Sequence, residues 1–339
     1  MKVCVHCFND IELKQFIKVN SIEKGKCDYC SNSFDTELLD IEELLDFFAE
    51  FIGIFKSDSQ GKSLIELIQS DWNLFSDTIV CNGMLEEILF FIDSTLSPED
   101  RVNYIDDILE STSHWEKLKE DIKWDKRFLT NTDILEDLGW VRFFQQTVQW
   151  PNAEFLFRAR LHYSGNQKEF MIEDMGFPDK RLVPAGRANP QGIPYLYLSK
   201  SVETVLYEVR STFLDEVSVG KFHVKDDLKI VLVDFTEKAS AFSKVDEIIE
   251  FTKSMLLKRY ISADLSKPIR RYDSEIEYIP TQFICEYIRY ISNADGILFN
   301  SSLHNGGKNI VLFNQDKVDC VKVDLYRVSQ VNILADPIK

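Results

Sequence analysis

The sequence has few helix-breaking residues and no long apolar run. Glycine occurs 13 times and proline 9 times in 339 residues, so we expect no long structureless linkers. A transmembrane helix needs roughly 18 apolar residues, and the best candidate, FFAEFIGIF, is interrupted by a glutamate. The first residues, MKVCVHCFND, lack the basic stretch followed by an apolar one that marks a signal peptide. These absences argue against a membrane or secreted protein and predict a cytoplasmic location.

Positive charge is scarce in the first part of the chain. Residues 1–150 carry 14 Lys and Arg against 30 Asp and Glu, whereas the remaining residues carry 25 against 26, within a total net charge of −17. Such an acidic region repels nucleic acid and anionic membranes, so neither is expected as a partner. Two interpretations of the acidity stay open, namely solvated helix faces or a docking surface for a basic partner. The length of the chain is sufficient for two domains.

Four of the seven cysteines form two close pairs near the N-terminus, Cys4-x2-Cys7 and Cys27-x2-Cys30. Each pair can bring two thiolates to one metal ion, and two pairs complete the tetrahedral set of four sulfurs that structural zinc prefers. The alternative, disulfide pairing, is disfavoured in a reducing cytosol. We therefore predict a structural zinc site within residues 1–35, with all four cysteines as ligands.

Apolar residues recur at helical spacing through residues 36–150. Between residues 38 and 52, Leu, Ile and Phe form one stripe, and Asp and Glu occupy the opposite face. Ser97-Pro98-Glu99-Asp100 and Thr132-Asp133 have the composition of helix starts, with capping residues followed by acids near the positive end of the helix dipole. We predict an acidic domain of about five helices over this range, with its aromatic residues in the core and no catalytic constellation.

Strand-like runs outnumber helix-like runs from about residue 153 onward. The strand-like runs are FLFRARLH, PYLYLS, EVSVGKFHV, KIVLVDF, DGILFN, KNIVLF and DLYRVSQVNIL, and the helix-like ones are SVETVLYEVRST, a segment around DEIIEFTKSMLLKRYI, and TQFICEYIRYI. Because regular helical crossovers do not join most of these strands, the pattern indicates an α+β fold rather than a doubly wound sheet.

The densest polar chemistry lies in AGRANPQGIPYLYLSKSVETVLYEVR, residues 185–210. A turn places Arg187 at the mouth of a strand, Tyr197 lies on that strand, and Glu208 lies one to two turns into the next helix. Arginine suits a phosphate or pyrophosphate, and an aromatic ring suits stacking on a base or nicotinamide. A carboxylate stabilises positive charge at an anomeric carbon, as cleavage of an N-glycosidic bond requires. From the residues alone, a structural ion pair between Arg187 and Glu208 with a core tyrosine remains an alternative.

The stretch GRANPQGIPYLYLSKSVETVLYEVR, followed by DGILFNSSLHNGGKNIVLF and preceded by FLFRAR, closely resembles the RES domain, a family named for an Arg, a Glu and a Ser. The resemblance implies an ADP-ribosyltransferase-like fold that consumes NAD. The catalytic positions that it implies are Arg187, an aromatic at Tyr197, and Glu208. The serine falls in a doublet, where we favour Ser301 as catalytic and leave Ser302 as a substrate contact.

The resemblance extends over more than half of the chain and implies a catalytic domain over 153–339. It also implies phosphate or ribose contacts by Arg158, at the end of the first strand, and Arg160, which shares its face. The zinc pairs and the acidic helices of 36–150 resemble, more loosely, the HEPN/RES N-terminal domain. Characterised RES proteins are toxins of toxin–antitoxin pairs, so a helix-turn-helix antitoxin is the partner that the resemblance implies.

These observations lead to an enzyme that cleaves the nicotinamide–ribose bond of NAD by hydrolysis or phosphorolysis. Arg187 and Arg158 would grip the pyrophosphate, Tyr197 would contact nicotinamide, and Glu208 would stabilise the oxocarbenium ion, with Ser301 holding the ribose or Glu208. Two alternatives are a protein ADP-ribosyltransferase and a non-catalytic module for nucleotide sensing and protein docking. The sequence leaves open the acceptor, the role of the N-terminal domain and whether the chain forms a homo-oligomer.

Overall fold

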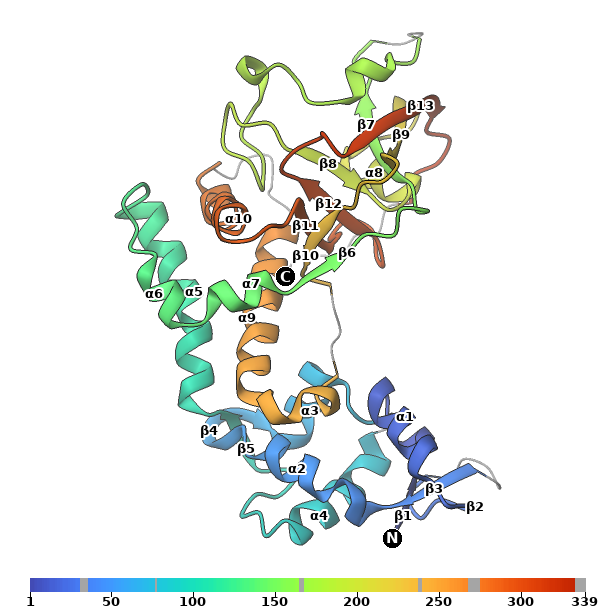
Figure 1. The fold of residues 1–339 in the computed structure, drawn as a ribbon, viewed down its shortest axis with the longest axis vertical. Helices are drawn as coiled ribbons and strands as arrows, with labels where there is room; N and C mark the ends of the chain where they lie inside the picture. Colours follow the sequence, from blue (N-terminus) through green and yellow to red (C-terminus); the bar gives the residue numbers. More distant parts are fainter. Residues whose placement is uncertain (31–35, 77, 165–167, 237–239, 268–274, 333–339) are drawn as a thin grey trace. The chain divides into compact units, whose positions relative to one another are not determined.

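The chain divides into two compact units (Figure 1). In this computed structural model the described residues are 1–30, 36–76, 78–164, 168–236, 240–267 and 275–332. The first unit is Met1–His114 with Lys238–Leu256, and the second is Trp115–Glu237 with Leu257–Lys339. Within those described ranges, no helix is long and apolar enough to cross a membrane. The three domain ranges inferred from the sequence, 1–35, 36–150 and 153–339, stay a prediction.

The first unit combines helices with short strands. Its elements are β1 (Lys2–Cys4), α1 (Ile11–Asn20), β2 (Glu23–Gly25), β3 (Thr36–Asp40), α2 (Leu45–Ile52), β4 (Phe55–Ser63), α3 (Leu64–Trp72), α4 (Thr78–Phe91), β5 (Arg101–Tyr104) and the first part of α5 (Asp106–Trp124). The described strands form a sheet in the order β1-β3-β2 and a separate pair, β4-β5. Periodicity predicted helices within residues 36–150 but not α1, which precedes that range. It did not predict β4 and β5 either, since most residues of these strands are polar.

One predicted helix start is wrong and another is confirmed. Ser97 to Asp100 form a turn in which the Ser97 N–H donates to the Asp100 carboxylate at 2.7 Å. The chain then continues as β5, which pairs with β4 instead of coiling. Ser and Asp side chains cap turns as well as helices, so these residues alone do not specify a helix. The pairing with β4 determines that the segment becomes a strand. Thr132 does precede a helix, α6 (Asp133–Asp137).

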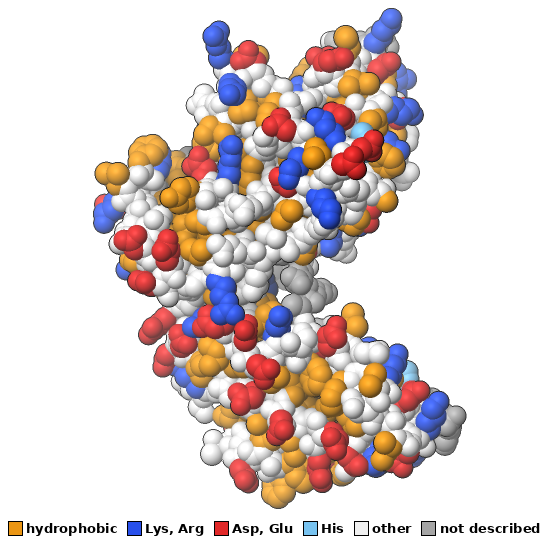
Figure 2. Space-filling view, viewed as in Figure 1, with side chains coloured by type: hydrophobic (Ala, Val, Ile, Leu, Met, Phe, Trp, Pro, Cys, Tyr) orange, Lys and Arg blue, Asp and Glu red, His pale blue; other side chains and the backbone are white. Residues whose placement is uncertain are grey.

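The apolar stripe of α2 and the residues before it is buried as predicted. Leu44, Phe48 and Phe51 are fully buried in the core of the first unit, whereas Glu43 and Glu50 are exposed. Figure 2 shows Asp and Glu side chains scattered over the visible face of this unit. This distribution agrees with the interpretation of the acidic residues as solvated helix faces.

The second unit is built on one large, mostly antiparallel sheet. Its further elements are α7 (Trp140–Gln145), β6 (Thr147–Gln149), β7 (Leu156–Leu161), β8 (Leu196–Ser199), α8 (Val202–Glu208), β9 (Glu216–Val224), β10 (Val231–Asp234), the part of α9 (Ile248–Ser266) from Leu257 onward, α10 (Ile279–Ile291), β11 (Gly296–Asn300), β12 (Lys308–Leu312) and β13 (Val318–Arg327). In the described residues the strand order is β13-β9-β7-β8-β12-β11-β10-β6, and β10 pairs with β11 in parallel. The predicted mixture of helices and sheet is therefore confirmed.

The last strand differs from its prediction. The sequence predicted a strand over DLYRVSQVNIL, but β13 begins at Val318 and ends at Arg327. Arg327 lies opposite Glu216, the first residue of the partner strand β9. Beyond this pair the Val328 N–H still donates to the Asp215 carbonyl at 3.0 Å, and the Leu214 N–H donates to the Val328 carbonyl at 2.9 Å. Leu214 has a left-handed backbone with φ of 70°, so the partner segment is no longer extended and the regular strand ends there.

Both faces of the sheet are covered by side chains. The end of α8 lies near the place where β7 and β8 are paired over only one residue. Ile297 and Val311 on one face belong to the core that buries apolar residues of α7, α9 and α10. Leu298, on the other face, belongs to a second core that also contains Phe222 of β9. Strands β7 and β8 share a single register pair at Phe157. Helix α8 packs on the β7 and β9 side, which brings its last residues toward the gap between β7 and β8.

Candidate functional site

A pocket of about 500 Å³ lies between β7, β8 and the end of α8, which is within the range of roughly 300–1,000 Å³ that is usual for small-molecule sites. Its lining consists of Arg158, Ala159, Gly186, Arg187, Tyr197, Leu198, Ser199, Val205, Glu208, Val209, Arg210, Tyr278, Phe299, Leu303 and Asn309. Arg158, Arg187, Tyr197 and Glu208, all singled out from the sequence, therefore share one pocket. Three other candidates, Arg160, Ser301 and Ser302, are not part of this lining.

Tyr197 holds the turn that carries Arg187. Its hydroxyl accepts a hydrogen bond from the Ala188 N–H at 3.0 Å and donates one to Asn189 Oδ1 at 2.8 Å. A Cβ on Gly186 would lie 2.7 Å from the tyrosine oxygen and 2.4 Å from Asn189 Oδ1, so only glycine allows this close approach. Burial raises the pKa of Tyr197, which keeps the hydroxyl protonated and able to donate.

The guanidinium of Arg187 lies at the C-terminal end of α9. Its Nη1 donates to the backbone carbonyls of Leu265 at 3.2 Å and Ser266 at 3.3 Å, where the helix dipole favours a cation. The described residues provide no hydrogen bond to Nε or Nη2, so both can bind a ligand. Among these residues no ion pair joins Arg187 to Glu208, which removes the alternative of a structural pair.

Arg158 and Arg160 project from the same face of β7. Arg158 Nη1 donates to the carbonyls of Met175 at 3.1 Å and Gly176 at 2.7 Å, and Arg160 Nη2 donates to the same Gly176 oxygen at 3.1 Å. Burial and the neighbouring Arg160 lower the pKa of Arg158 to about 10, so it remains a poorly solvated cation at neutral pH. Because no carboxylate of the described chain forms an ion pair with Arg158, its charge is available to an anion.

Glu208 is the last residue of α8, and only one of its carboxylate oxygens is bonded. Oε1 accepts from the Ser301 hydroxyl and from Asn309 Nδ2, both at 2.7 Å. Within the ranges that the structure describes, nothing donates to Oε2. The carboxylate is thus held through one oxygen and can present the other to the pocket.

The two serines of the doublet, Ser301 and Ser302, differ in their contacts in the loop between β11 and β12. The Ser301 N–H donates to the carbonyl of Gly307 at 2.8 Å, and its Oγ accepts from the His304 N–H at 3.1 Å while donating to Glu208. Ser302 is exposed. Hence Ser301, the residue favoured from the sequence, contacts the carboxylate.

Sequence reasoning missed several pocket residues, above all Asn309 and Tyr278. Asn309 is buried in β12 directly before the apolar residues Ile310 to Leu312, and a polar residue at the start of an apolar run is a signal that could have been noticed. Tyr278 reaches the pocket from the short 3-10 helix Glu275–Tyr278 before α10. No motif accompanies that tyrosine in the sequence.

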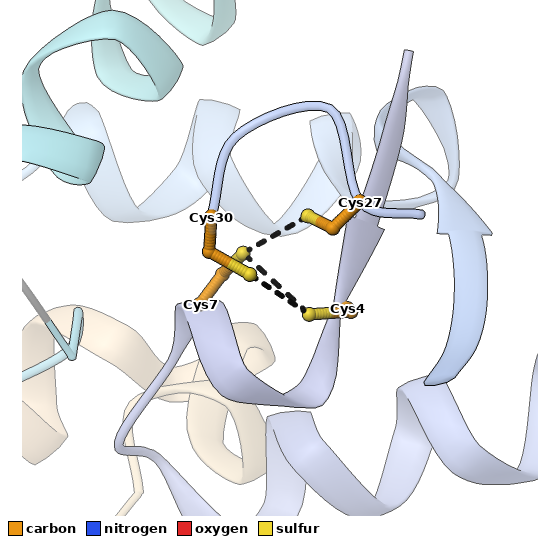
Figure 3. A group of neighbouring side chains, drawn as sticks. All are labelled: Cys4, Cys7, Cys27 and Cys30. Atoms are coloured by element: carbon orange, nitrogen blue, oxygen red, sulfur yellow. Dashed lines mark hydrogen bonds between the residues drawn. The ribbon is translucent and has the colours of Figure 1, made fainter. Parts of the chain in front are cut away.

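In the first unit the four cysteines come together (Figure 3). All four are buried, and their sulfur atoms lie within 4.8 Å of one another. The shortest separations, Cys4–Cys30 and Cys7–Cys27, are 3.4 Å, far longer than the roughly 2.05 Å of a disulfide. The thiols are therefore free, and the alternative of disulfide pairing is wrong.

This cluster fits a tetrahedral metal ion. Cys4 ends β1, Cys7 ends the 3-10 helix Val5–Cys7, and the second pair follows β2. Hydrogen bonds from Cys4 and Cys7 lower the pKa of Cys27, whereas their bonds to Cys27 raise the pKa of Cys4 and Cys7. A divalent cation favours the thiolate form of its ligands and would hold the four sulfur atoms as thiolates. Such an ion would crosslink the N-terminal segments.

The second unit is thus a mixed helix and sheet domain with a pocket that arginine side chains and the Glu208 carboxylate line. The model of the RES domain family matches residues 156–332, which is more than half of the chain, and the protein belongs to this family. RES domains are associated with activity on NAD. No curated protein and no solved structure matches the chain.

Proposed function

We propose that the protein is an enzyme that cleaves the nicotinamide–ribose bond of NAD. The observation that carries this proposal is Glu208, whose carboxylate accepts hydrogen bonds from the described residues through Oε1 alone. It lines a pocket together with Arg158, Arg187 and Arg210. A dinucleotide with an anionic pyrophosphate and a cationic nicotinamide ribose matches this arrangement of charge. The family membership supports the same substrate.

In the proposed complex the arginines bind the pyrophosphate. Among the described residues, no group bonds Nε or Nη2 of Arg187 and no carboxylate pairs with the buried Arg158, so both arginines can donate charge-assisted hydrogen bonds to phosphate oxygens. Arg160 supports Arg158 from the same strand face and adds to the positive field. Tyr197 acts by holding the turn of Arg187, and its ring forms part of the wall.

The bond between C1′ of the ribose and the nicotinamide nitrogen breaks with its electron pair passing to nitrogen, which was positively charged and leaves neutral. No proton has to be supplied to the leaving group. Positive charge develops on the ribose, and the Glu208 carboxylate stabilises it through Oε2. Water then adds to C1′ and loses a proton to give ADP-ribose, or phosphate adds to give its phosphorylated counterpart.

The wider context of this activity is also a proposal. The resemblance to RES proteins supports an ADP-ribosyltransferase-like fold, a role as a bacterial toxin or defence effector, and a helix-turn-helix antitoxin as partner. A separate and looser resemblance, that of the cysteine pairs and acidic helices, supports a HEPN/RES-type N-terminal domain. The four-sulfur donor set supports zinc as the ion of the cysteine cluster.

The test is release of nicotinamide from NAD by purified protein, with and without phosphate, in wild type and in Glu208→Gln. The matched control is Glu203→Gln, the same change on the same helix at a side chain that is 68% exposed. We expect Glu208→Gln to lower kcat by about 10²–10³-fold, as for loss of one electrostatic stabiliser, and Glu203→Gln to match wild type. A phosphate requirement would identify the acceptor, whereas intact NAD with wild-type protein would refute the proposal.

A further inference from the structure

Asn309 connects the carboxylate of Glu208 to the central sheet. It lies on β12 and is only 6% exposed, and its Nδ2 donates to Glu208 Oε1 at 2.7 Å. The other donor to this oxygen, Ser301, lies in a loop. Asn309 is therefore the donor to Glu208 that lies on a strand paired on both sides.

Ser199 determines which way the Asn309 amide points. The two residues are cross-strand neighbours in the β8–β12 register, and the Ser199 hydroxyl donates to Asn309 Oδ1 at 2.5 Å. With the amide reversed, its oxygen would face Glu208 Oε1, and two acceptors would repel each other. The hydroxyl of Ser199, itself 2% exposed, thus keeps the NH2 group directed at the carboxylate.

We propose that Asn309, oriented by Ser199, is a positioning residue that fixes the Glu208 carboxylate so that it faces the positive charge developing on the ribose. This inference rests on the proposed NAD cleavage. Two donors occupy Oε1, which leaves Oε2 as the oxygen that meets the developing charge. Glu208 ends its helix, and Arg210 shortly afterwards has a left-handed backbone with φ of 52°. Because no further helical turn supports Glu208, the strand-borne amide supplies the rigidity.

The first test compares Asn309→Ala, Asn309→Asp and Ser199→Ala in the full chain. Losing the donor in Asn309→Ala should lower kcat for nicotinamide release by about 10-fold with KM changed less than about threefold, since orientation rather than binding is lost. Asn309→Asp places a second carboxylate against Glu208, so the two share a proton. We expect kcat to fall by about 10²-fold and the acidic limb of the pH–rate profile to move to higher pH. Ser199→Ala should lower kcat by about threefold to tenfold because the amide can then reverse.

The matched control is Ser218→Ala, which removes a buried hydroxyl from β9 of the same sheet. Ser218 bonds His162 and the Phe170 N–H and lies outside the pocket lining. A purely structural effect would appear equally in this variant, with an unmoved pH profile. Equal losses in Ser199→Ala and Ser218→Ala, or an Asn309→Asp profile superimposable on wild type, would overturn the positioning role.

A second readout does not depend on activity. Crystal structures of wild type and Asn309→Ala should show Glu208 ordered on Ser301 and Asn309 in the first, and in a different or split side-chain rotamer in the second. An identical Glu208 rotamer in both would overturn the inference even if NAD is cleaved. If wild-type protein leaves NAD intact, the proposed function fails, and the crystallographic comparison still decides whether Asn309 fixes the carboxylate.

Discussion

Replacing Tyr197 by phenylalanine separates two roles for this side chain. If its ring alone contacts nicotinamide, phenylalanine keeps the contact and little changes. In the structure the hydroxyl makes two hydrogen bonds to the turn of Arg187, at 3.0 and 2.8 Å. Each buried group left without a partner costs about 1–3 kcal/mol. Allowing for relaxation, the turn should lose about 2–4 kcal/mol of local stability.

Hydrogen exchange of the Ala188 amide measures this loss directly. Since 1.4 kcal/mol is a factor of ten, a cost of about 2 kcal/mol or more raises the population of open turn by about 30-fold or more. The peptide containing Ala188 should exchange faster by that factor in Tyr197→Phe. The KM for NAD should rise by about 10-fold, because Arg187 is less well placed for the pyrophosphate.

The control is Tyr195→Phe, the same change on the same chain segment. The Tyr195 ring packs on Phe313 with centroids 5.1 Å apart, and the Arg289 guanidinium lies over the same ring, 5.9 Å from its centroid. We expect unchanged exchange at Ala188 in this variant. If Tyr197→Phe keeps the wild-type exchange rate at Ala188 and the wild-type KM for NAD, the hydroxyl does not anchor the turn. The contact of the ring with nicotinamide would then be the role left for Tyr197.

Two further predictions concern the serine doublet and the cysteine cluster. Ser301→Ala removes a donor to Glu208 and should lower kcat for nicotinamide release by about 10-fold. Ser302→Ala changes an exposed residue and should keep the wild-type rate. Equal rates in the two variants would contradict the assignment of Ser301 as the serine that acts on Glu208. The purified chain should contain one zinc ion by elemental analysis, and Cys27→Ser should lose it together with thermal stability of the first unit, while Cys320→Ser, outside the cluster, keeps it. Full zinc content in Cys27→Ser would contradict the metal site.

Sequence spacing alone indicated the cysteine cluster, because two Cys-x2-Cys pairs can close on one ion whatever lies between them. It also indicated most strands of the second unit, since their apolar runs are bounded by turn residues. The sequence pattern gave the wrong prediction for β5. The proline and acids after Ser97 favour a helix start, but the segment that follows them pairs with β4 as a strand. Local composition cannot report a partner strand that lies far along the chain.

The catalytic candidates show the same division. Arg187, Tyr197 and Glu208 lie close together in the sequence, so a turn, a strand and a short helix bring them toward one pocket. The roles of their polar atoms came only from tertiary packing: the Tyr197 hydroxyl holds the turn, and Asn309, a hundred residues after Glu208, directs its carboxylate. Such contacts depend on strand register and on which atoms are buried together. The sequence by itself determined which residue types were present near the pocket. The pairing of β8 with β12 places Ser199 beside Asn309, and this contact determines that Asn309 bonds one oxygen of Glu208 and leaves the other available to the substrate.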